Sequence, residues 1–361
     1  MSDRPLRVAF DATPVISGRT GVARYVTQLG AALERQSVEL RQFAVGRRSF
    51  ALPAGARHIR FPARAVERWW RTVPWPTIEQ LVGDVQAVHA TGLVMPPTRR
   101  PLVVTAHDIA AVRYPELHPD RHVRQQRAQL DLLHRASAIV SVSRATADDL
   151  VQLGIPAERV VVAPPGLTRL PEPAPPLAGL DGRGGYLLTV GETSPRKGYG
   201  TLVGALARLD RGPALVMAGP PAGDERRLRS LIASFGLGPR VTRLGPVTDA
   251  VLARLYRDAL VLCFPSIAEG FGSPVLEAMG TGLPVLASDI PVLRELAGDA
   301  AVYVPNDDEK AWAEAIQAIV SDDSLRRALA QRGLSRAAEF TWERAAAATC
   351  DAYRLALGAV P

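Results

Sequence analysis

Residues 264–291 read FPSIAEGFGSPVLEAMGTGLPVLASDIP, and this stretch decides the fold. An apolar strand pattern at 259–264 leads into a glycine-containing loop, a helix pattern begins at Ser273 and Pro274, and a second strand pattern follows at 284–287. Strand, helix and strand in this order are typical of a parallel sheet covered by helices.

The same alternation extends in both directions along the chain. Because strand patterns recur between longer helical patterns, the sequence predicts an α/β protein with two doubly wound, Rossmann-like domains. In the first half the strand patterns lie at 6–10, 85–89, 102–106, 138–142 and 160–163, with helix patterns at 22–33 and 120–135. In the second half they lie at 186–190, 214–218, 241–244, 259–264, 284–287 and 301–304.

Proline and glycine mark the boundary between the two halves. Residues 170–185 contain PEPAPPLAG and DGRGG, which supply neither regular strands nor helices, so we interpret them as a linker. The predicted domains are 1–169 and 186–341. The helix pattern at 342–357 is not needed to complete the second sheet, and we expect the C-terminal segment 342–361 to pack back on the first domain.

Composition limits the class of protein. The chain has 361 residues, 47% of them hydrophobic, which is enough for two cores of ordinary size. It shows neither a secretory leader pattern nor an apolar run long enough to span a bilayer, so we expect a cytoplasmic protein. Its two cysteines, Cys263 and Cys350, indicate neither a disulfide framework nor a zinc site, and Cys263 lies in an apolar strand pattern.

The formal net charge of +7 favours anionic partners, which include nucleotide phosphates, nucleic acid and anionic membranes. A genome rich in G and C would produce the same excess of arginine without any binding role. Charge alone does not decide between these explanations.

The loop and helix start at 269–277 carry the most informative chemistry. Gly270 and Gly272 allow a close approach of backbone to a ligand, and Ser273 begins a helix whose first amides and dipole favour an anion such as a diphosphate. Glu277 follows about one turn later, where a carboxylate can accept hydrogen bonds from two ribose hydroxyls, and Glu269 lies on the loop. The alternative is an ordinary strand-to-helix connection with two solvated glutamates.

Arg196 and Lys197 lie on a second loop, residues 191–198 (GETSPRKG), which follows the strand pattern at 186–190. Because carboxyl ends of parallel strands share one edge of the sheet, both cations are placed to neutralise a departing diphosphate. Adjacent basic residues on a loop are otherwise usually solvated.

Two loops of the first half are candidates for the same site. The first runs from the strand pattern at 6–10 to a helix and contains Asp11 and Gly21, where a bulky side chain would block the helix start. In the second, His107 and Asp108 end the strand pattern at 102–106. The alternatives are a plain strand-to-helix turn and a structural histidine.

Glu269 and Glu277 resemble the E-x7-E signature of the retaining family 4 glycosyltransferases, and the similarity extends along nearly the whole chain. The resemblance implies the GT-B fold, in which two Rossmann-like domains face a central cleft. It places Glu269 near the donor sugar, Glu277 on the ribose, and Gly270, Phe271, Gly272 and Ser273 against sugar and phosphate.

The resemblance also implies roles for the second loop. Lys197 matches the lysine that contacts phosphate, and Val247 matches the contact to the nucleotide base. Many members have an arginine where this chain has Glu192. Since a carboxylate would repel the diphosphate, either Arg196 takes over the task or Glu192 turns away, and we favour the first.

In the first domain the resemblance places Gly21 beside donor phosphate and acceptor, and His107 against the hydroxyls of the donor sugar. We expect Asp108 to orient His107 or its loop, and we assign Asp11 with Asp108 to the acceptor side.

The implied reaction is hexose transfer with retention at the anomeric carbon, in which the departing phosphate oxygen takes the proton of the acceptor on the same face of the sugar. Catalysis of this reaction mainly requires electrostatic stabilisation of the departing diphosphate. The chain has no D-x-D motif, so we expect no cofactor and no obligatory metal.

The HDI loop at 107–109, followed by RYPELH at 113–118, resembles mannosyl- and rhamnosyltransferases of polysaccharide synthesis. This resemblance favours GDP-mannose as the donor, with dTDP-rhamnose or another dTDP- or UDP-sugar next.

The expected acceptor is a glycan or a lipid-linked glycan. Arginines interleave with tryptophans in RAVERWWR at 64–71 and in PWP at 74–76, a pattern typical of contact with an anionic inner membrane face or, alternatively, of ordinary packing.

Other classes remain open at this point. An NAD-dependent oxidoreductase would need a complete G-x-G-x-x-G, which does not follow the first strand pattern. A non-catalytic sugar-nucleotide-binding protein would share the fold, and Lys197, Glu269 and Glu277 argue against it. Nucleic acid is not an expected partner, because the arginines are dispersed and no recognition module is evident.

Overall fold

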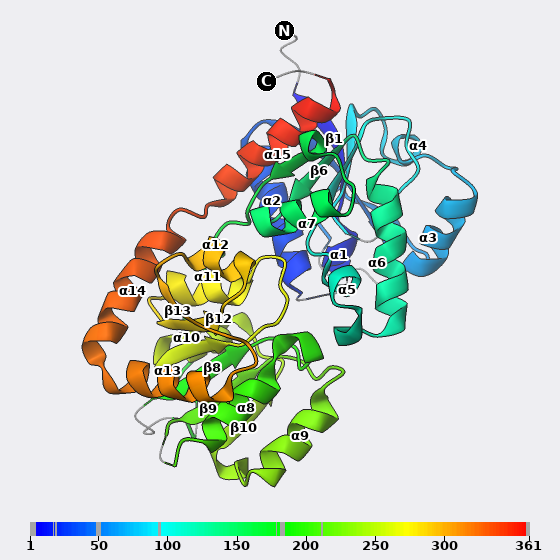
Figure 1. Ribbon diagram of the computed structural model, residues 1–361. Helices are drawn as coiled ribbons and strands as arrows, with labels where there is room; N and C mark the ends of the chain where they lie inside the picture. The colour runs from blue at the N-terminus through cyan, green and yellow to red at the C-terminus, as the bar shows by residue number, and fades with distance from the viewer. Residues whose placement is uncertain are drawn as a thin grey trace. The chain divides into compact units, whose positions relative to one another are not determined.

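The computed structural model describes residues 5–16, 18, 20–47, 52–92, 95–177, 179–180, 185–210 and 212–358. The chain forms two compact α/β units, which Figure 1 shows as separate sheets with their helices. Unit 1 comprises Met1–Val112, Asp120–Gly166 and Phe340–Pro361, and unit 2 comprises Arg113–Pro119 and Leu167–Glu339. The predicted linker, 170–185, is grouped with unit 2, where the backbone of Ala174 is hydrogen-bonded to Ala250 and to the Arg254 side chain.

Among its described residues, unit 1 has one sheet of seven parallel strands in the order β3-β2-β1-β4-β5-β6-β7. Its buried strands are apolar on both faces, as expected for a parallel sheet covered by helices. The strands are β1 (Leu6–Asp11), β2 (Val38–Val45), β3 (Arg57–Ile59), β4 (Ala87–Ala90), β5 (Leu102–Ala106), β6 (Ala138–Ser141) and β7 (Val160–Val162).

The helices of unit 1 begin in several cases at a capping residue, such as Thr20 before α2 and Ser143 before α7. They are α1 (Thr13–Ile16), α2 (Gly21–Arg35), α3 (Ala63–Thr72), α4 (Ile78–Val82), α5 (Ala110–Arg113), α6 (Asp120–Leu133), α7 (Arg144–Gln152), α15 (Trp342–Ala356) and the 3₁₀ turn η2 (Ala157–Arg159). The turn η1 (Pro115–Leu117) belongs to unit 2.

The C-terminal helix α15 packs on unit 1, beside α2 and strands β6 and β7 (Figure 1). Its Tyr353 hydroxyl lies 2.8 Å from Nδ1 of the fully buried His89, whose Nε2 lies 2.8 Å from the Thr105 hydroxyl. Burial lowers the pKa of His89 to about 3, so this histidine is neutral at pH 7 and its hydrogen bonds fix α15 to the sheet.

Unit 2 has, among its described residues, six parallel strands in the order β10-β9-β8-β11-β12-β13. The strands are β8 (Tyr186–Val190), β9 (Ala214–Ala218), β10 (Val241–Gly245), β11 (Val261–Phe264), β12 (Val285–Ser288) and β13 (Ala301–Val304). The helices are α8 (Tyr199–Ala207), α9 (Glu225–Ser234), α10 (Asp249–Asp258), α11 (Ser273–Gly280), α12 (Pro291–Ala297), α13 (Glu309–Ser321) and α14 (Asp323–Ala337), with 3₁₀ turns η3 (Pro195–Lys197) and η4 (Gly238–Arg240).

Each sheet reverses its strand order at one place, between β1 and β4 in unit 1 and between β8 and β11 in unit 2. Ligands of open α/β sheets bind outside the carboxyl ends of the strands at such a switch point. The loops that follow these four strands are therefore the places to look for a site.

Two strands, β2 and β3, were not predicted. β2 contains exposed or half-exposed polar residues, among them Glu39 and Arg41, so it lacks the continuous apolar run of a fully buried strand. β3 has three residues and pairs with β2 alone, at the edge of the sheet. Cys263 is fully buried and unpaired, as predicted, and burial raises the pKa of its thiol.

Within the described part of the chain, no helix has the length and apolar character that crossing a bilayer requires.

Candidate functional site

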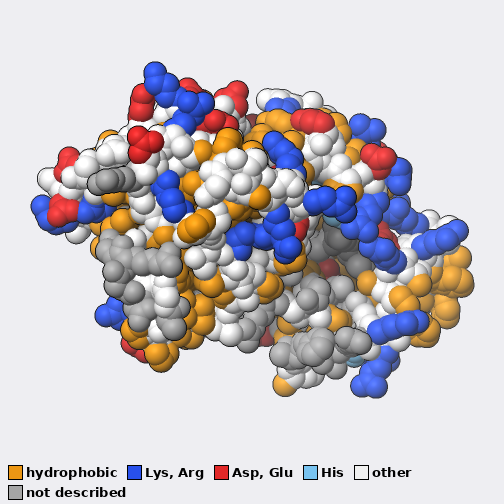
Figure 2. Space-filling view, turned by 90° about the horizontal axis from the view of Figure 1, so that it is seen from below, with side chains coloured by type: hydrophobic (Ala, Val, Ile, Leu, Met, Phe, Trp, Pro, Cys, Tyr) orange, Lys and Arg blue, Asp and Glu red, His pale blue; other side chains and the backbone are white. Residues whose placement is uncertain are grey.

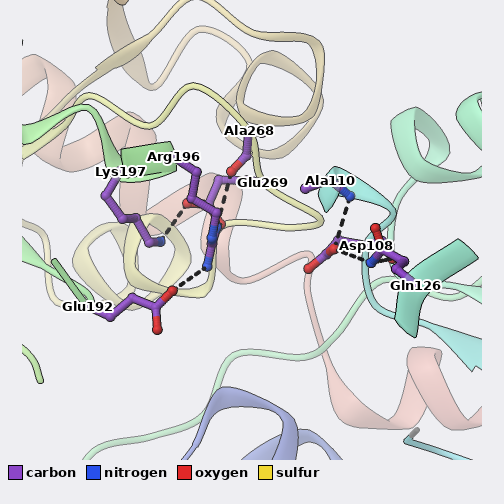
Figure 3. A network of polar contacts seen from close by, with 8 residues as sticks. All are labelled: Asp108, Ala110, Gln126, Glu192, Arg196, Lys197, Ala268 and Glu269. Atoms are coloured by element: carbon purple, nitrogen blue, oxygen red, sulfur yellow. Dashed lines mark hydrogen bonds and ion pairs between the residues drawn. The ribbon is translucent and has the colours of Figure 1, made fainter. Parts of the chain in front are cut away.

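The switch point of unit 2 brings two basic residues onto one carboxylate. Turn η3 follows β8 and carries Arg196 and Lys197, and the loop after β11 carries Glu269. Lys197 Nζ lies 2.5 Å from Glu269 Oε1, and Arg196 Nη1 lies 3.1 Å from Glu269 Oε2 (Figure 3). The two loops predicted separately from the sequence thus meet in one charged cluster, which we call the Lys197 cluster: Arg196, Lys197 and Glu269.

Two side chains of the Lys197 cluster are buried, and that of Arg196 is partly buried. The side chain of Lys197 is 6% exposed and that of Glu269 is 9% exposed. Burial alone would raise the pKa of the Glu269 carboxyl, but the charges of Lys197 and Arg196 outweigh it and lower this pKa to about 2. Burial lowers the pKa of Lys197 from its ordinary value, and the charge of Glu269 opposes that shift. Charges held at low dielectric interact strongly with any ion that replaces water beside them.

The composition makes Lys197 informative. The chain contains two lysines, Lys197 and Lys310, and otherwise uses arginine as its strong base. One of these lysines is exposed on α13, and the other is buried against Glu269 and lies 4.8 Å from the ring centre of Phe264. A compact ammonium at this one buried place argues for a specific requirement.

Glycine allows the two loops to approach closely enough to form the cluster. Gly198 has φ +63°, and a Cβ there would lie 2.1 Å from the carbonyl oxygen of Pro265. Close by, Ile267 N donates to Arg196 O at 2.8 Å. The backbone after β8 therefore packs directly on the backbone after β11, which fixes the positions of Arg196 and Lys197.

Helix α11 begins beside this cluster. Gly272 precedes it with φ +98°, Ser273 is exposed at its first position, and Pro274 follows, as the sequence predicted. The amides at the start of a helix and its dipole favour an anion. Gly270, Phe271 and Gly272 connect Glu269 to α11, and Ser273 is the first residue of that helix. Their contacts with sugar and phosphate stay predictions.

Glu277 is buried one turn into α11, and its Oε2 accepts a hydrogen bond of 2.9 Å from the Tyr256 hydroxyl. Glu277 is therefore not a solvated glutamate. Tyr256 occupies an ordinary apolar position of the amphipathic helix α10, so no sequence pattern points to its contact with Glu277.

Val247 is half-buried in the connection between β10 and α10. The predicted helix cap is present, because the Thr248 hydroxyl accepts from Val251 N at 3.3 Å. Val247 thus lies at the carboxyl end of a strand two positions away from β8 in the sheet.

Glu192 faces Arg196. Its Oε1 lies 3.6 Å from Arg196 Nη2, on the side of the guanidinium away from Glu269 (Figure 3). Glu192 thus faces Arg196 when no diphosphate is bound, and whether it turns away from a bound diphosphate stays a prediction. Whether Arg196 acts as the second phosphate ligand stays a prediction.

Unit 1 has a polar group at each strand end that flanks its switch point. Asp11, at the end of β1, is fully buried; its Oδ1 accepts from Thr13 N at 2.8 Å, and its Oδ2 has no hydrogen-bond partner in the described part of the chain. Burial raises the pKa of Asp11 to about 6, although hydrogen bonds from Thr13 and Gly92 oppose it.

His107 follows β5. Its Nε2 lies 2.8 Å from the carbonyl oxygen of Thr91, and its ring packs edge-to-face on Tyr25 with 4.8 Å between ring centres. Because a carbonyl only accepts, Nε2 is the donor and carries the proton of the neutral ring. Burial lowers the pKa of His107, so the neutral ring, with Nδ1 as an acceptor, is favoured.

Asp108 orients its loop rather than His107. Its Oδ1 accepts hydrogen bonds from Ala110 N at 3.1 Å and from Gln126 Nε2 at 3.0 Å, which fixes the start of α5 against α6 (Figure 3). The same glutamine accepts from Val112 N at 3.0 Å. Gln126 was missed by sequence reasoning because it occupies an unremarkable position of a helical pattern.

A cavity of about 260 Å³ lies beside His107 in unit 1. The polar residues of its lining are Thr105, His107, Asp108, Gln126 and Gln129. The rest of the lining is mainly apolar and includes Val22, Met95, Ile109, Leu130 and Leu133. An apolar cavity with a few converging polar groups is the usual form of a small-molecule site.

Within the described part of the chain, the start of α2 at Gly21 lies in open space. Gly21 begins α2 next to the cap Thr20, whose hydroxyl accepts from Ala23 N at 3.1 Å. A Cβ at Gly21 would meet none of the described residues within 4 Å, so an alanine would fit here. That a bulky side chain would block the helix start stays a prediction. Ser17 and Arg19 of the same loop lie outside the described residues.

The structure therefore brings together Arg196, Lys197 and Glu269 in unit 2, with α11 and the buried Glu277 after them. In unit 1, Asp11 and His107 are joined through Thr91, whose hydroxyl donates to the Asp11 carbonyl oxygen at 2.5 Å and whose own carbonyl accepts from His107. No group of three or more His, Cys, Asp or Glu side chains suited to a metal ion occurs among the residues that the structure describes.

Comparison with known proteins gives matches in both units. A model of the family Glycosyltransferase Family 4 matches residues 19–168, and a model of the family Glycosyl transferases group 1 matches residues 178–336. O-antigen chain mannosyltransferase B of Escherichia coli is 32% identical over 282 residues, which cover 74% of this chain and 74% of that protein. D-inositol 3-phosphate glycosyltransferase of Nocardia farcinica is 33% identical, over 72% of this chain and 62% of that protein.

Solved structures share the fold at lower identity. Sucrose-phosphate synthase from Thermosynechococcus elongatus has a TM-score of 0.80 at 22% identity and covers 98% of this chain and 100% of its own. Anabaena HepE in complex with UDP-glucose has a TM-score of 0.73 at 20% identity, over 96% of this chain and 98% of its own.

Proposed function

The chain belongs to the family 4 glycosyltransferases of GT-B fold, and from this premise we propose that it moves a hexose, with mannose favoured, from a nucleoside-diphosphate sugar to a glycan or lipid-linked acceptor. The observation that carries the proposal is the Lys197 cluster at the switch point of unit 2. Its two cations, the buried Lys197 and the partly buried Arg196, suit a diphosphate leaving group, whose negative charge grows as the anomeric bond breaks.

The proposed roles follow from where each group lies. Lys197 and Arg196 neutralise the diphosphate together with the amides at the start of α11. Glu269 holds these two cations in place and lies on the loop beside the hexose. Glu277, fixed by Tyr256, accepts hydrogen bonds from the ribose, and Val247 contacts the base.

The acceptor attacks the anomeric carbon on the face that the diphosphate leaves, and a phosphate oxygen takes its proton, so the configuration is retained. This route needs no protein nucleophile and no metal ion, and we expect the reaction to proceed without an added cofactor. In unit 1, His107 accepts through Nδ1 from a sugar hydroxyl, and Asp11 supports the loop on the acceptor side.

Mannose as the transferred sugar is supported by the relative from Escherichia coli, whose name is that of a mannosyltransferase. A panel of sugar nucleotides tests this. A ligand at a hundred times its dissociation constant adds about 2.7 kcal/mol to the free energy of unfolding, so thermal denaturation should detect it. We expect GDP and GDP-mannose to raise Tm more than the corresponding UDP and dTDP compounds. A larger rise in Tm with a UDP- or dTDP-sugar would identify that sugar nucleotide as the donor in place of GDP-mannose. No rise in Tm with any member of the panel would refute the proposed function.

We further propose that the protein acts at the inner membrane face, on a lipid-linked acceptor. The 60–75 segment, which contains α3, exposes Arg60, Arg64, Arg68 and Arg71 together with Phe61, Trp69 and Trp75. Figure 2 shows basic and hydrophobic side chains side by side at its right-hand edge, the side on which α3 lies in Figure 1. Exposed aromatics beside arginines suit an anionic lipid surface.

The tryptophans of this segment divide into two kinds. Trp70 is 7% exposed and packs in the core of unit 1, whereas Trp69 and Trp75 are 50% and 61% exposed. Trp69 Nε1 donates to the backbone carbonyl oxygen of Trp75 at 2.8 Å, which holds the Trp69 ring against the backbone at residue 75. Ordinary packing therefore explains Trp70 and leaves Trp69 and Trp75 for a lipid surface.

Changing Trp69 and Trp75 together to alanine should reduce co-sedimentation with phosphatidylglycerol vesicles about tenfold, because both apolar rings would be lost from the interface. Phe235→Ala, an exposed aromatic of unit 2, is the matched control and should bind as the wild type does. Equal binding by the double variant, or equal binding to neutral phosphatidylcholine vesicles, would contradict the membrane proposal.

A further inference from the structure

Arg196 is held from two sides by carboxylates of different character. Glu269 and the Ala268 carbonyl lie at Nη1, at 3.1 Å each, and Glu192 lies at Nη2, at 3.6 Å (Figure 3). Glu269 is buried, whereas the side chain of Glu192 is 43% exposed. A separation of 3.6 Å is too long for a strong hydrogen bond, so Glu192 is the partner that leaves more easily.

The backbone at Glu192 is fixed by its neighbours. Gly191 N donates to Ala218 O at 2.9 Å, and Thr193 N donates to Pro220 O at 3.1 Å. The buried Thr193 hydroxyl also donates to Glu225 Oε2 at 3.0 Å and accepts from Ala222 N at 2.8 Å. The loop therefore keeps Glu192 beside Arg196, and movement of its carboxylate requires only a rotation of the side chain.

The charges of these four residues balance. Arg196 and Lys197 are positive, and Glu192 and Glu269 are negative, so the group has no surplus positive charge before an anion arrives. A diphosphate that engages Arg196 at Nη2 meets Glu192 there and competes with its carboxylate for the same cation. Displacing Glu269 would leave a buried charge without its partners, whereas displacing Glu192 moves a half-exposed carboxylate into water.

We propose that Glu192 is a built-in competitor of the diphosphate: it holds the outer end of Arg196 while the site is empty, yields to the donor, and repels the nucleoside diphosphate that remains after transfer. This inference rests on the proposed function and assigns Glu192 the control of product affinity. Glu192 is thus a specificity-determining position for the charge of the ligand.

Calorimetric titration with GDP, or with the nucleoside diphosphate that the panel selects, tests the proposal. Glu192→Gln keeps the shape of the side chain and removes its charge, so it should lower the Kd of the diphosphate about fivefold. The difference should shrink at high salt, because the carboxylate is half exposed. The corresponding uncharged nucleoside should bind both proteins equally.

Glu314→Gln is the control, since Glu314 is exposed on α13 and pairs with Lys310. It should leave the Kd of the diphosphate unchanged. If the wild type binds the diphosphate and Glu192→Gln binds it equally or more weakly, the role of Glu192 is refuted while the function stands. If the wild type binds no nucleoside diphosphate, the proposed function itself fails.

Discussion

Replacing Lys197 with alanine is expected to reduce kcat about a thousandfold, the effect of removing one preorganised donor to a developing anion. Lys197 is buried, its ammonium is 2.5 Å from Glu269, and it lies at the carboxyl end of β8 where the sheet reverses its strand order. An arginine elsewhere cannot replace it, because the backbone of turn η3 fixes the place from which each cation reaches the site. Initial rates at saturating donor measure the loss.

The same substitution leaves Glu269 buried with Arg196 and without Lys197. We expect the free energy of unfolding to fall by about 3 kcal/mol, and circular dichroism at the assay temperature should show that the variant is still folded. Lys310→Ala removes the other lysine of the chain, which is exposed, and should match the wild type in both rate and stability. A folded Lys197→Ala protein with wild-type kcat would contradict the proposed mechanism.

Gly198→Ala is expected to lower the free energy of unfolding by about 4 kcal/mol and to reduce kcat at least a hundredfold. A Cβ at Gly198 would lie 2.1 Å from the Pro265 carbonyl oxygen, a backbone atom that cannot rotate away. Relief requires the loops after β8 and β11 to separate, which would pull Arg196 and Lys197 from Glu269. Urea unfolding and initial rates measure the two effects.

Gly236 provides a matched control for the backbone conformation. It has φ +64°, against +63° for Gly198, and a Cβ there would meet none of the described residues within 4 Å. Gly236→Ala should therefore show the strain of the left-handed conformation alone, about 1 kcal/mol, and unchanged kcat. Equal destabilisation of the two variants would show that the packing of the two loops is not what requires glycine at position 198.

The sequence predicted most of the fold, because buried parallel strands form continuous apolar runs. Strands β5, β8, β9 and β13 have the predicted bounds. β2 could not be found in this way, since its polar residues interrupt the run, and β3 is too short to carry a pattern.

The site was predicted as separate parts rather than as an assembly. Arg196, Lys197 and Glu269 were each singled out, but their mutual contact depends on the packing of two loops 72 residues apart in the chain. Tyr256 is hydrogen-bonded to Glu277, and Gln126 is hydrogen-bonded to Asp108. Both lie on helices whose sequence patterns do not distinguish these two positions from their neighbours.

The central claim is that the Lys197 cluster recognises a diphosphate, and a calorimetric comparison of a nucleoside diphosphate with its monophosphate tests it most directly. Because the β-phosphate would meet Arg196 and Lys197, the wild-type protein should bind the diphosphate at least about tenfold more tightly, a difference of about 1.4 kcal/mol. Equal affinity for the two nucleotides would mean that these cations do not face the leaving group and would contradict the account.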